Sequence, residues 1–375
     1  MRKVNPSSTL KVLENAMMRK KKGIDITILA AGEPDFDTPD YIKECAKKAI
    51  ESGKTKYTPV GGILELREEI SKSLKREKGL DYSPEQILVS SGAKQSIFNI
   101  LFTLVGKDDE VIIPIPYWVS YPEMVKLCDG KPVFVESKDD FHLNIDAIKR
   151  KINSRTKVII INSPNNPTGI VYNKDEIFEL SEIIKDKNIY VISDEIYDKL
   201  IYENVQNFSI AQIDWMKEKT FIINGVSKSY AMTGWRIGWA AGPKNEINAA
   251  KNIQSHTTSC PSSISQYASL CALKDDNAVI KMREKFEERR NFCIDFLNGI
   301  EGIKYPKPYG AFYFFIDISK YEKDSIKFCT ELLEYNLAVI PGIEFGMDGF
   351  IRFSYASSIE EIEKGLQNLK KFIKR

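Results

Sequence analysis

Short apolar runs alternate with amphipathic stretches over the first two thirds of the chain. Each run is continuous and rich in β-branched residues, which is typical of a strand buried on both faces of a sheet. Residues 174–187, between two of these runs, carry Ile177, Leu180, Ile183 and Ile184 on one helical face. The pattern predicts strands at residues 87–89, 111–113, 133–135, 158–161, 190–192 and 221–223, with helices between several of them.

This alternation predicts an α/β fold with a mostly parallel sheet covered by helices, in which ligands bind at the carboxyl ends of the strands. The last third of the chain has a different pattern. A long charged helix is expected over residues 277–298, strands over 310–316 and 350–353, and a final helix over 359–374. We therefore expect a smaller α+β unit that begins near residues 270–280.

Composition excludes several classes of function. The chain has 375 residues, enough for two domains, and 43% of them are hydrophobic, which is ordinary for a globular protein. Lys and Arg (54) nearly balance Asp and Glu (52), which argues against a nucleic-acid or membrane-surface binder. There are two histidines, His142 and His256, so a His-rich metal site is excluded and a Ser-His-Asp hydrolase would have few candidates.

The six cysteines are widely scattered and form no C-x-x-C pair, so neither a zinc site nor a redox dithiol is expected. In a chain of this length they are predicted to be reduced core residues. The first residues lack the apolar stretch of a secretory signal, and no apolar run approaches the roughly 20 residues that a membrane span needs. A cytoplasmic protein is therefore expected.

Nucleotide-binding motifs are not found. Gly53-Lys54-Thr55 resembles the end of a P-loop, but Lys48 stands where that motif needs a glycine, and the segment follows a helical pattern instead of a strand. No G-x-G-x-x-G occurs, so an enzyme that uses NAD or a nucleoside triphosphate is not expected.

Candidate chemistry follows the predicted strands. Residues 90–95 join strand 87–89 to a helix over 96–104, and their small side chains form either an anion site of backbone N–H groups or an ordinary tight turn. Residues 162–169 follow strand 158–161 and contain two prolines and a glycine, which indicates a rigid and unusual loop.

Two charged residues stand at further strand ends. Asp194 follows strand 190–192 and is either a structural ion-pair residue or the group that holds a proton on a ligand nitrogen. Lys228 follows strand 221–223. A lone lysine is usually a solvated surface residue, but the nearby Ser227 and Arg236 favour a buried amine that attacks carbonyls.

Together these segments resemble the class I aminotransferases of fold type I, which use pyridoxal 5′-phosphate, and most strongly the bacterial aspartate/prephenate aminotransferase branch. The resemblance covers nearly the whole chain and keeps the motifs in the family's order. The matching segments are residues 31–39 (AGEPDFDTP), 56–59 (KYTP), 116–123 (PYWVSYPE), 163–169 (SPNNPTG), 193–197 (SDEIY), 227–228 (SK), 232–238 (MTGWRIG), 310–313 (GAFY) and 351–355 (IRFSY).

The resemblance implies a large domain with a mostly parallel seven-stranded sheet and a smaller α+β domain. Residues 1–35 would be an N-terminal segment that packs with the small domain, residues 36–275 the large cofactor-binding domain, and residues 276–375 the small domain. It also implies a homodimer with shared active sites, because the family tyrosine that matches Tyr57 reaches the cofactor phosphate from the partner subunit.

The resemblance assigns roles around the cofactor ring. Lys228 would form the Schiff base, be displaced by substrate and then move the α-proton as general base and acid. Asp194 would keep the pyridine nitrogen protonated, so that the ring accepts electrons. Tyr197 and Asn166 would donate to the ring hydroxylate, and Trp118 would stack on the ring.

The same resemblance assigns the anionic groups of cofactor and substrate. The phosphate would take backbone donors around Ala93 and Lys94, the Ser227 hydroxyl and the Arg236 guanidinium. The substrate α-carboxylate would bind Arg352. Further substrate contacts would come from Gly32, Trp118, Asn166 and Lys94.

The implied reaction moves an amino group from an amino acid, expected to be aspartate, to a 2-oxo acid, expected to be 2-oxoglutarate. In this branch the distal carboxylate of the donor binds a lysine that matches Lys94, helped by hydroxyls near the N-terminus (Ser7, Ser8 and Thr9). Lys94 is explained equally well as a solvated residue at a helix start, so aromatic, prephenate or alanine substrates stay open. A cofactor-dependent C–S lyase or a cyclopropane-forming enzyme on the same fold also stays open. A non-enzymatic regulator on this fold is disfavoured, because such proteins usually carry an added DNA-binding module.

Overall fold

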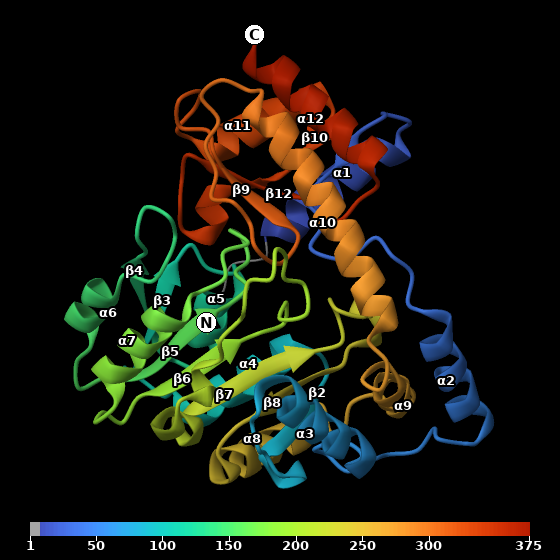
Figure 1. The fold of residues 1–375 in the computed structure, drawn as a ribbon, viewed down its shortest axis with the longest axis vertical. Coiled ribbons are helices and arrows are strands. Elements are labelled where there is room, and N and C mark those ends of the chain that lie inside the picture. Colours follow the sequence, from blue (N-terminus) through green and yellow to red (C-terminus); the bar gives the residue numbers. More distant parts are fainter. Residues whose placement is uncertain (1–7) are drawn as a thin grey trace.

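The computed structural model describes residues 8–375, which surround a seven-stranded sheet (Figure 1). Its strands are β2 (Ile87–Ser90), β3 (Glu110–Ile115), β4 (Lys131–Glu136), β5 (Thr156–Asn162), β6 (Tyr190–Asp194), β7 (Thr220–Gly225) and β8 (Gly238–Ala241). Their order is β2-β8-β7-β6-β5-β3-β4. β8 is antiparallel to both neighbours, and the other pairings are parallel. The predicted α/β fold with a mostly parallel sheet is confirmed.

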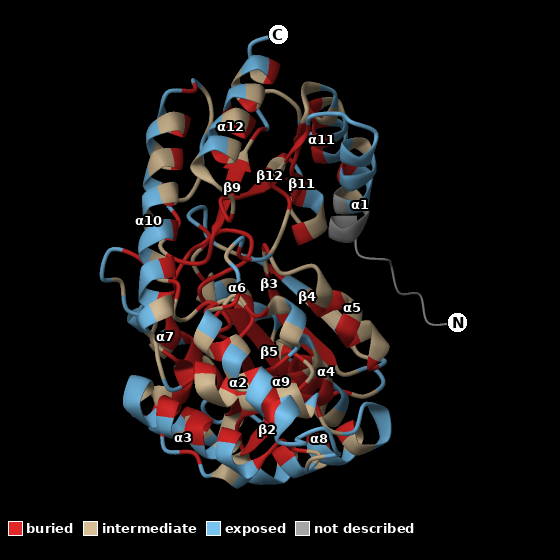
Figure 2. Ribbon diagram, turned by 90° about the vertical axis from the view of Figure 1, so that its right-hand side faces the viewer, coloured by how far each residue is buried: buried red, intermediate tan, exposed pale blue. Residues whose placement is uncertain are grey.

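Side chains alternate between the two faces of this sheet. Along β7, Phe221 and Ile223 pack on one face and Ile222 on the other, as the two-residue period of a strand requires. The first face is covered by α4 (Ala93–Leu104), α5 (Ser120–Leu127) and α8 (Lys244–Thr257). The second is covered by α2 (Asp40–Glu51), α3 (Leu64–Lys78), α6 (Ile145–Lys151), α7 (Lys174–Ile184) and α9 (Ser263–Ala272). The sheet is therefore buried between helices whose outward residues are exposed (Figure 2).

Two strands differ from the expectation. β4 lies at the edge of the sheet and is partly exposed, so the prediction that it is buried on both faces is wrong. An edge strand has a neighbour on one side only, and Phe134 there is exposed to solvent. The apolar pattern also missed β8, because its sequence GWAA contains no β-branched residue.

The last third of the chain forms a smaller unit at one end of the molecule (Figure 1). Its antiparallel sheet has the order β11-β12-β9, formed by β11 (Ile340–Pro341), β12 (Phe350–Ser354) and β9 (Tyr313–Asp317). The helices are α10 (Asn277–Asn298), α11 (Ser325–Leu332) and α12 (Ile359–Ile373). The predicted long helix, strands and final helix are confirmed, with shifts of at most three residues at their ends.

The N-terminal segment packs against this smaller unit. β1 (Thr27–Ile28) pairs in parallel with β10 (Leu337–Ala338). Arg19 of α1 (Ser8–Lys21) donates to the Leu333 carbonyl at 3.2 Å. The division of the chain at residues 35 and 275 stays a prediction.

Short 3-10 helices connect the elements of the described chain. They are η1 (Pro84–Gln86), η2 (Ile210–Gln212), η3 (Asp214–Lys219), η4 (Thr233–Trp235), η5 (Leu333–Tyr335) and η6 (Gly342–Phe345). Over residues 8–375, no helix combines the length and apolar character that crossing a bilayer requires.

One pair of cysteines is bonded, so the expectation of reduced thiols throughout is wrong. α2 and α9 pack side by side, which brings the Cα atoms of Cys45 and Cys271 to 6.5 Å and allows a disulfide between them. Their separation of 226 residues in the sequence conceals this proximity. The cysteines outside this disulfide are Cys260, which is partly buried, and the buried Cys128, Cys293 and Cys329.

Candidate active site

A cavity of about 390 Å³ lies at the carboxyl ends of β5, β6 and β7. Distant segments meet in it: Asp194 ends β6, Lys228 follows β7, Arg352 comes from β12 and Gly32 precedes α2. The other predicted residues that line it are Asn166, Trp118, Ala93, Lys94, Ser227, Arg236 and Tyr197. Among the predicted site residues whose side chains the structure describes, the fold thus brings together all except Tyr57 within one chain.

Lys228 places its amine inside this cavity. Nζ donates to the Gly32 carbonyl at 2.6 Å, across 196 residues of sequence. Burial lowers the pKa of Lys228 to about 8, and the charges of Arg236 and Arg352 act in the same direction, against the charge of Glu33, which raises it. Near pH 7 such an amine has a larger neutral fraction than an ordinary surface lysine has. The neutral amine is the form that attacks a carbonyl.

Asp194 is buried at the end of β6. Its Oδ2 accepts from the Tyr121 hydroxyl at 2.7 Å, and its Oδ1 accepts from the backbone N–H of Ile196 at 3.2 Å. Burial raises the pKa of Asp194 to about 6, although these two donors lower it. Such a carboxylate is stabilised by a protonated nitrogen brought by a ligand.

The turn after β2 forms a cradle suited to an anion. Gly92 has a φ of +88°, and a Cβ there would lie 2.6 Å from Nη2 of Arg236, so a side chain would displace the guanidinium. A Cβ on Gly238 would lie 2.2 Å from the Ala93 nitrogen. Because glycine has no side chain, β8 can approach the start of α4 at this point. Backbone N–H groups at this helix start, together with the Arg236 guanidinium, can surround a phosphate.

Arg352 is a buried guanidinium held by neutral groups. It is 3% exposed, its Nη1 donates to Asn166 Oδ1 at 3.0 Å, and its Nη2 donates to the Ala30 carbonyl at 2.9 Å. Cζ of Arg352 lies 4.5 Å from the centre of the Tyr313 ring. Burial lowers the pKa of Arg352. Among the described ion pairs none involves Arg352, so a ligand carboxylate would supply the missing anion.

Aromatic residues complete the wall of the cavity. The Tyr197 and Tyr313 hydroxyls are 2.9 Å apart and hydrogen-bonded. Trp118 contacts Tyr121 edge to face at 5.3 Å. Nζ of Lys94 lies 5.0 Å from the centre of the Trp118 ring, and burial lowers the pKa of Lys94. Lys94 therefore lines the cavity, although the residue is exposed to solvent, and its role at a distal carboxylate stays a prediction.

Tyr57 lies apart from this group. It is 92% exposed and does not line the cavity of its own chain. Ser7 lies outside the described residues, as do the side chains of Ser8 and Thr9, so their expected role near a distal carboxylate stays a prediction.

Two functional candidates had no role in the sequence expectation. Tyr121 contacts Asp194, and Tyr313 contacts both Tyr197 and Arg352. Both lie in motifs that carry the family resemblance, at residues 116–123 and 310–313. A buried tyrosine hydroxyl needs a partner, but the partner is known only once the strands are placed beside one another.

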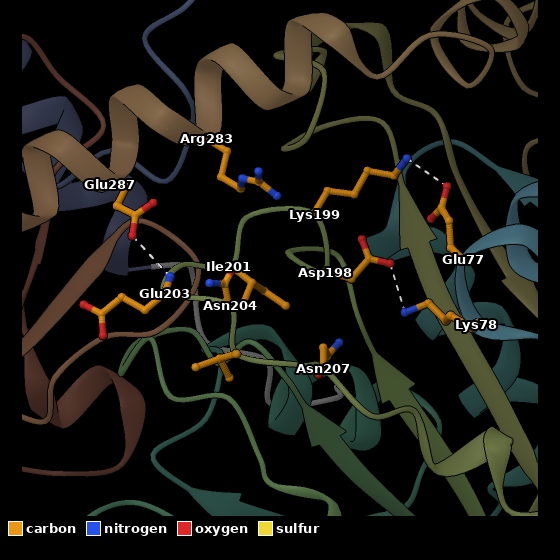
Figure 3. Close-up of a pocket in the computed structure, with 11 residues that line it drawn as sticks. Glu77, Lys78, Asp198, Lys199, Ile201, Glu203, Asn204, Asn207, Arg283 and Glu287 are labelled. Atoms are coloured by element: carbon orange, nitrogen blue, oxygen red, sulfur yellow. Dashed lines mark hydrogen bonds and ion pairs between the residues drawn. The ribbon is translucent and has the colours of Figure 1, made fainter.

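A second cavity of about 300 Å³ lies beside α10 (Figure 3). Its charged side chains largely pair with one another: Nζ of Lys78 lies 3.1 Å from Asp198, and Nζ of Lys199 lies 3.0 Å from Glu77. None of the predicted site residues lines it. The reactive amine and the unpaired guanidinium therefore place the candidate chemistry in the first cavity.

Comparison with known proteins agrees with this geometry. The family model described as "Aminotransferase class I and II" matches residues 24–369. The aspartate aminotransferase of Bacillus sp. (strain YM-2) is 44% identical over 99% of this chain and 97% of the relative. The aspartate/prephenate aminotransferase of Thermus thermophilus is 41% identical over 99% of this chain and 97% of the relative.

Solved structures show the same likeness. The aspartate aminotransferase from Thermus thermophilus with maleate superposes with a TM-score of 0.95 at 41% identity, covering 98% of this chain and 97% of the other. The aspartate aminotransferase from Rhizobium meliloti gives a TM-score of 0.95 at 38% identity, covering 99% and 97%. A family match over most of the chain and relatives above 40% identity lead to one conclusion: this chain belongs to the class I and II aminotransferases.

Proposed function

We propose that this aminotransferase moves the amino group of aspartate to a 2-oxo acid, with 2-oxoglutarate as acceptor, and that it uses pyridoxal 5′-phosphate. The observation that carries the proposal is the meeting of Lys228, Asp194 and Arg352 in one cavity. These three groups provide an amine with a lowered pKa, a carboxylate for a protonated ring nitrogen, and a guanidinium for a substrate carboxylate.

The cavity suits that cofactor. The start of α4 and the Arg236 guanidinium line the cavity and supply donors for its phosphate, and Asp194 matches a protonated ring nitrogen. When bound, pyridoxal 5′-phosphate supplies a carbonyl that takes up nitrogen and a ring that withdraws electrons from the substrate α-carbon. Trp118 and Tyr197 line the space that the ring would fill.

The residues of the chain would then perform the proton transfers. Nζ of Lys228, once released from the cofactor carbonyl, would take the substrate α-proton and return it at a second carbon. Asp194 would hold the proton on the ring nitrogen throughout. Arg352 would bind the α-carboxylate through a bidentate pair, which fixes the orientation of the α-carbon.

The preference for aspartate rests on a second cation. A dicarboxylic substrate needs a partner for its distal carboxylate, and the amine of Lys94 lies on the same cavity wall as Trp118. Relatives at 44% and 41% identity carry the names aspartate and aspartate/prephenate aminotransferase. Both names are consistent with an acidic donor.

We also propose a homodimer with shared sites. Tyr57 is exposed on its own chain, and an exposed tyrosine gains burial if it enters a partner's cavity. In this arrangement Tyr57 would contact the phosphate bound by the other subunit.

The assignment is tested by reduction with borohydride. The loaded protein should be yellow, bleach on reduction and carry the label on Lys228, and a Lys228→Ala variant should be colourless and inactive. Full aminotransferase activity in Lys228→Ala would refute the proposal.

The donor is tested by a spectral half-reaction screen over amino acids. Aspartate and glutamate should convert the cofactor to its amine form. Release of pyruvate or ammonia without amino transfer would instead favour a lyase.

A further inference from the structure

A small cavity of about 20 Å³ lies under the turn that carries Lys228. Its lining includes Asp198 from the turn after β6, Ser229 from the turn after β7, and Trp239 from β8. Its volume matches that needed by one water molecule and excludes larger ligands. It is separate from the cavity that holds the predicted site residues.

Three polar atoms of this lining have no hydrogen-bond partner in the protein: Oδ1 of Asp198, Oγ of Ser229 and Nε1 of Trp239. Their side chains are well buried, with Ser229 2% and Trp239 5% exposed, and the Asp198 side chain 7% exposed. Buried polar groups in folded proteins almost always find a partner, in the protein or in ordered water. Three unsatisfied groups around one small cavity therefore indicate a shared occupant.

The chemistry of the three atoms identifies that occupant. An indole N–H can only donate, an ionised carboxylate can only accept, and a hydroxyl can do both. A metal ion is excluded because an indole N–H is not a ligand, and an apolar occupant would leave all three groups unsatisfied. We propose that one buried water accepts from Trp239, donates to Asp198 and exchanges a hydrogen bond with Ser229.

This water would connect the two turns that carry the reactive groups. Ser229 follows Lys228 directly, and Asp198 lies four residues after Asp194. Oδ2 of Asp198 is already held by Lys78 at 3.1 Å and by Asn224 at 2.8 Å. Through the water, this fixed carboxylate would also hold the Lys228 turn. Ser229 and Trp239 are then positioning residues, a role that rests on the proposed function.

Four residues separate the water from the 300 Å³ cavity, because Glu77, Lys78, Asp198 and Lys199 line both spaces. Figure 3 shows their ion pairs, Lys78 with Asp198 and Lys199 with Glu77, at the edge of the larger cavity. These pairs must separate before the water can exchange in that direction. The water should therefore be well ordered.

A high-resolution crystal structure of the holoenzyme tests the water itself. We expect one ordered peak within hydrogen-bond distance of all three atoms, and its loss or displacement in Trp239→Phe, which keeps an aromatic ring but removes the N–H. Trp215→Phe is the control, because Trp215 lies at the surface. An empty cavity in the wild type, or an unchanged peak in Trp239→Phe, would overturn the proposal.

A double-mutant cycle tests the bridge. Ser229→Ala and Trp239→Phe should each lower the midpoint of thermal unfolding. The decrease in the double variant should be clearly smaller than the sum of the two single decreases, because both changes remove the same water. Fully additive shifts would contradict a shared water.

The positioning role has its own readout. The absorbance of the bound cofactor is recorded as a function of pH, and the pH at which the change is half complete is the midpoint. This midpoint should shift in Ser229→Ala and should stay at the wild-type value in Trp215→Phe. An unmoved midpoint would refute the positioning role. A protein that binds no cofactor would refute the proposed function instead, and the crystallographic test of the water would still stand.

Discussion

At the scale of single residues, burial without a matching countercharge creates the reactivity of this site. The amine of Lys228 and the carboxyl of Asp194 both have pKa values shifted toward neutrality, to about 8 and about 6. In each case desolvation is the largest cause, because the folded chain removes water from a charged group. Neighbouring donors then tune the shift, and Tyr121 is the clearest example.

Replacing Tyr121 with Phe should move the pH dependence of cofactor binding. The Tyr121 hydroxyl lowers the pKa of Asp194, so its loss should raise that pKa above about 6. The ionised carboxylate is the form that binds a protonated ring nitrogen. In the wild type, cofactor affinity should fall as pH falls through about 6, and in Tyr121→Phe the midpoint should lie about one unit higher.

The measurement is the dissociation constant of the cofactor between pH 5 and 8, followed by fluorescence. Tyr117→Phe is a matched control, because Tyr117 is a nearby, partly buried tyrosine that stacks on Phe134 and does not contact Asp194. Coincident midpoints in wild type and Tyr121→Phe would show that the contact has no electrostatic effect.

Replacing Lys94 with Met should separate acidic from neutral donors. A charge-assisted hydrogen bond contributes about 1.5–3 kcal/mol, so kcat/KM for aspartate should fall about 10- to 100-fold while that for alanine changes little. Steady-state kinetics with both donors give the comparison, and Lys281→Met, on the exposed surface of α10, is the control. An equal decrease of kcat/KM for aspartate and for alanine would show that Lys94 does not bind the distal carboxylate.

At the scale of elements, side chains at strand and helix ends hold the scaffold in place. His142 contacts Glu176 at 2.7 Å, and Glu176 also accepts from the backbone N–H of Asn173 at the start of α7. This histidine therefore contacts the capping box of α7 and lies outside the lining of the active-site cavity. The disulfide between α2 and α9 fixes the scaffold in another way, by linking two packed helices, and the sequence did not predict it.

Thiol titration in denaturant should find four reactive thiols in the oxidised chain and six after reduction, because one pair of the six cysteines is bonded. Cys45→Ala should lower the free energy of unfolding by about 2–4 kcal/mol, because a closed loop restricts the unfolded chain. Cys260→Ala is the control, since Cys260 is free. Six thiols without reductant would mean that the pair stays reduced, as a cytoplasmic glutathione pool favours.

At the scale of the whole molecule, sequence predicted the layers and the site better than the connections between them. Apolar runs located most strands of the large sheet. The pattern missed β8, because that strand contains no β-branched residue, and it placed β4 in the interior of the sheet although β4 is an edge strand. The motif residues around Lys228 converge because strand ends share one edge of the sheet. Pairings such as Tyr121 with Asp194 depend on tertiary packing, which no local pattern encodes.

A mixing experiment tests whether two chains share each site. Lys228→Ala and Tyr57→Ala homodimers should both be impaired when cofactor is limiting. A hybrid dimer would hold one complete site, with Lys228 from one chain and Tyr57 from the other. Half of the dimers formed by refolding equal amounts of the two variants should be hybrids, so activity should rise toward about a quarter of the wild-type value. Activity equal to the mean of the two variants would mean that each chain builds its site alone.

The pairing of β1 with β10 has a consequence for the order of events during synthesis. Residues 27–28 leave the ribosome early, whereas their partners at 337–338 are made when most of the chain is complete. Ala30 and Gly32 follow β1 directly, and their contacts with Arg352 and Lys228 span 322 and 196 residues. Contacts between such distant segments form slowly. A nascent chain can therefore build its central sheet early, but its catalytic centre is among the last parts to be assembled.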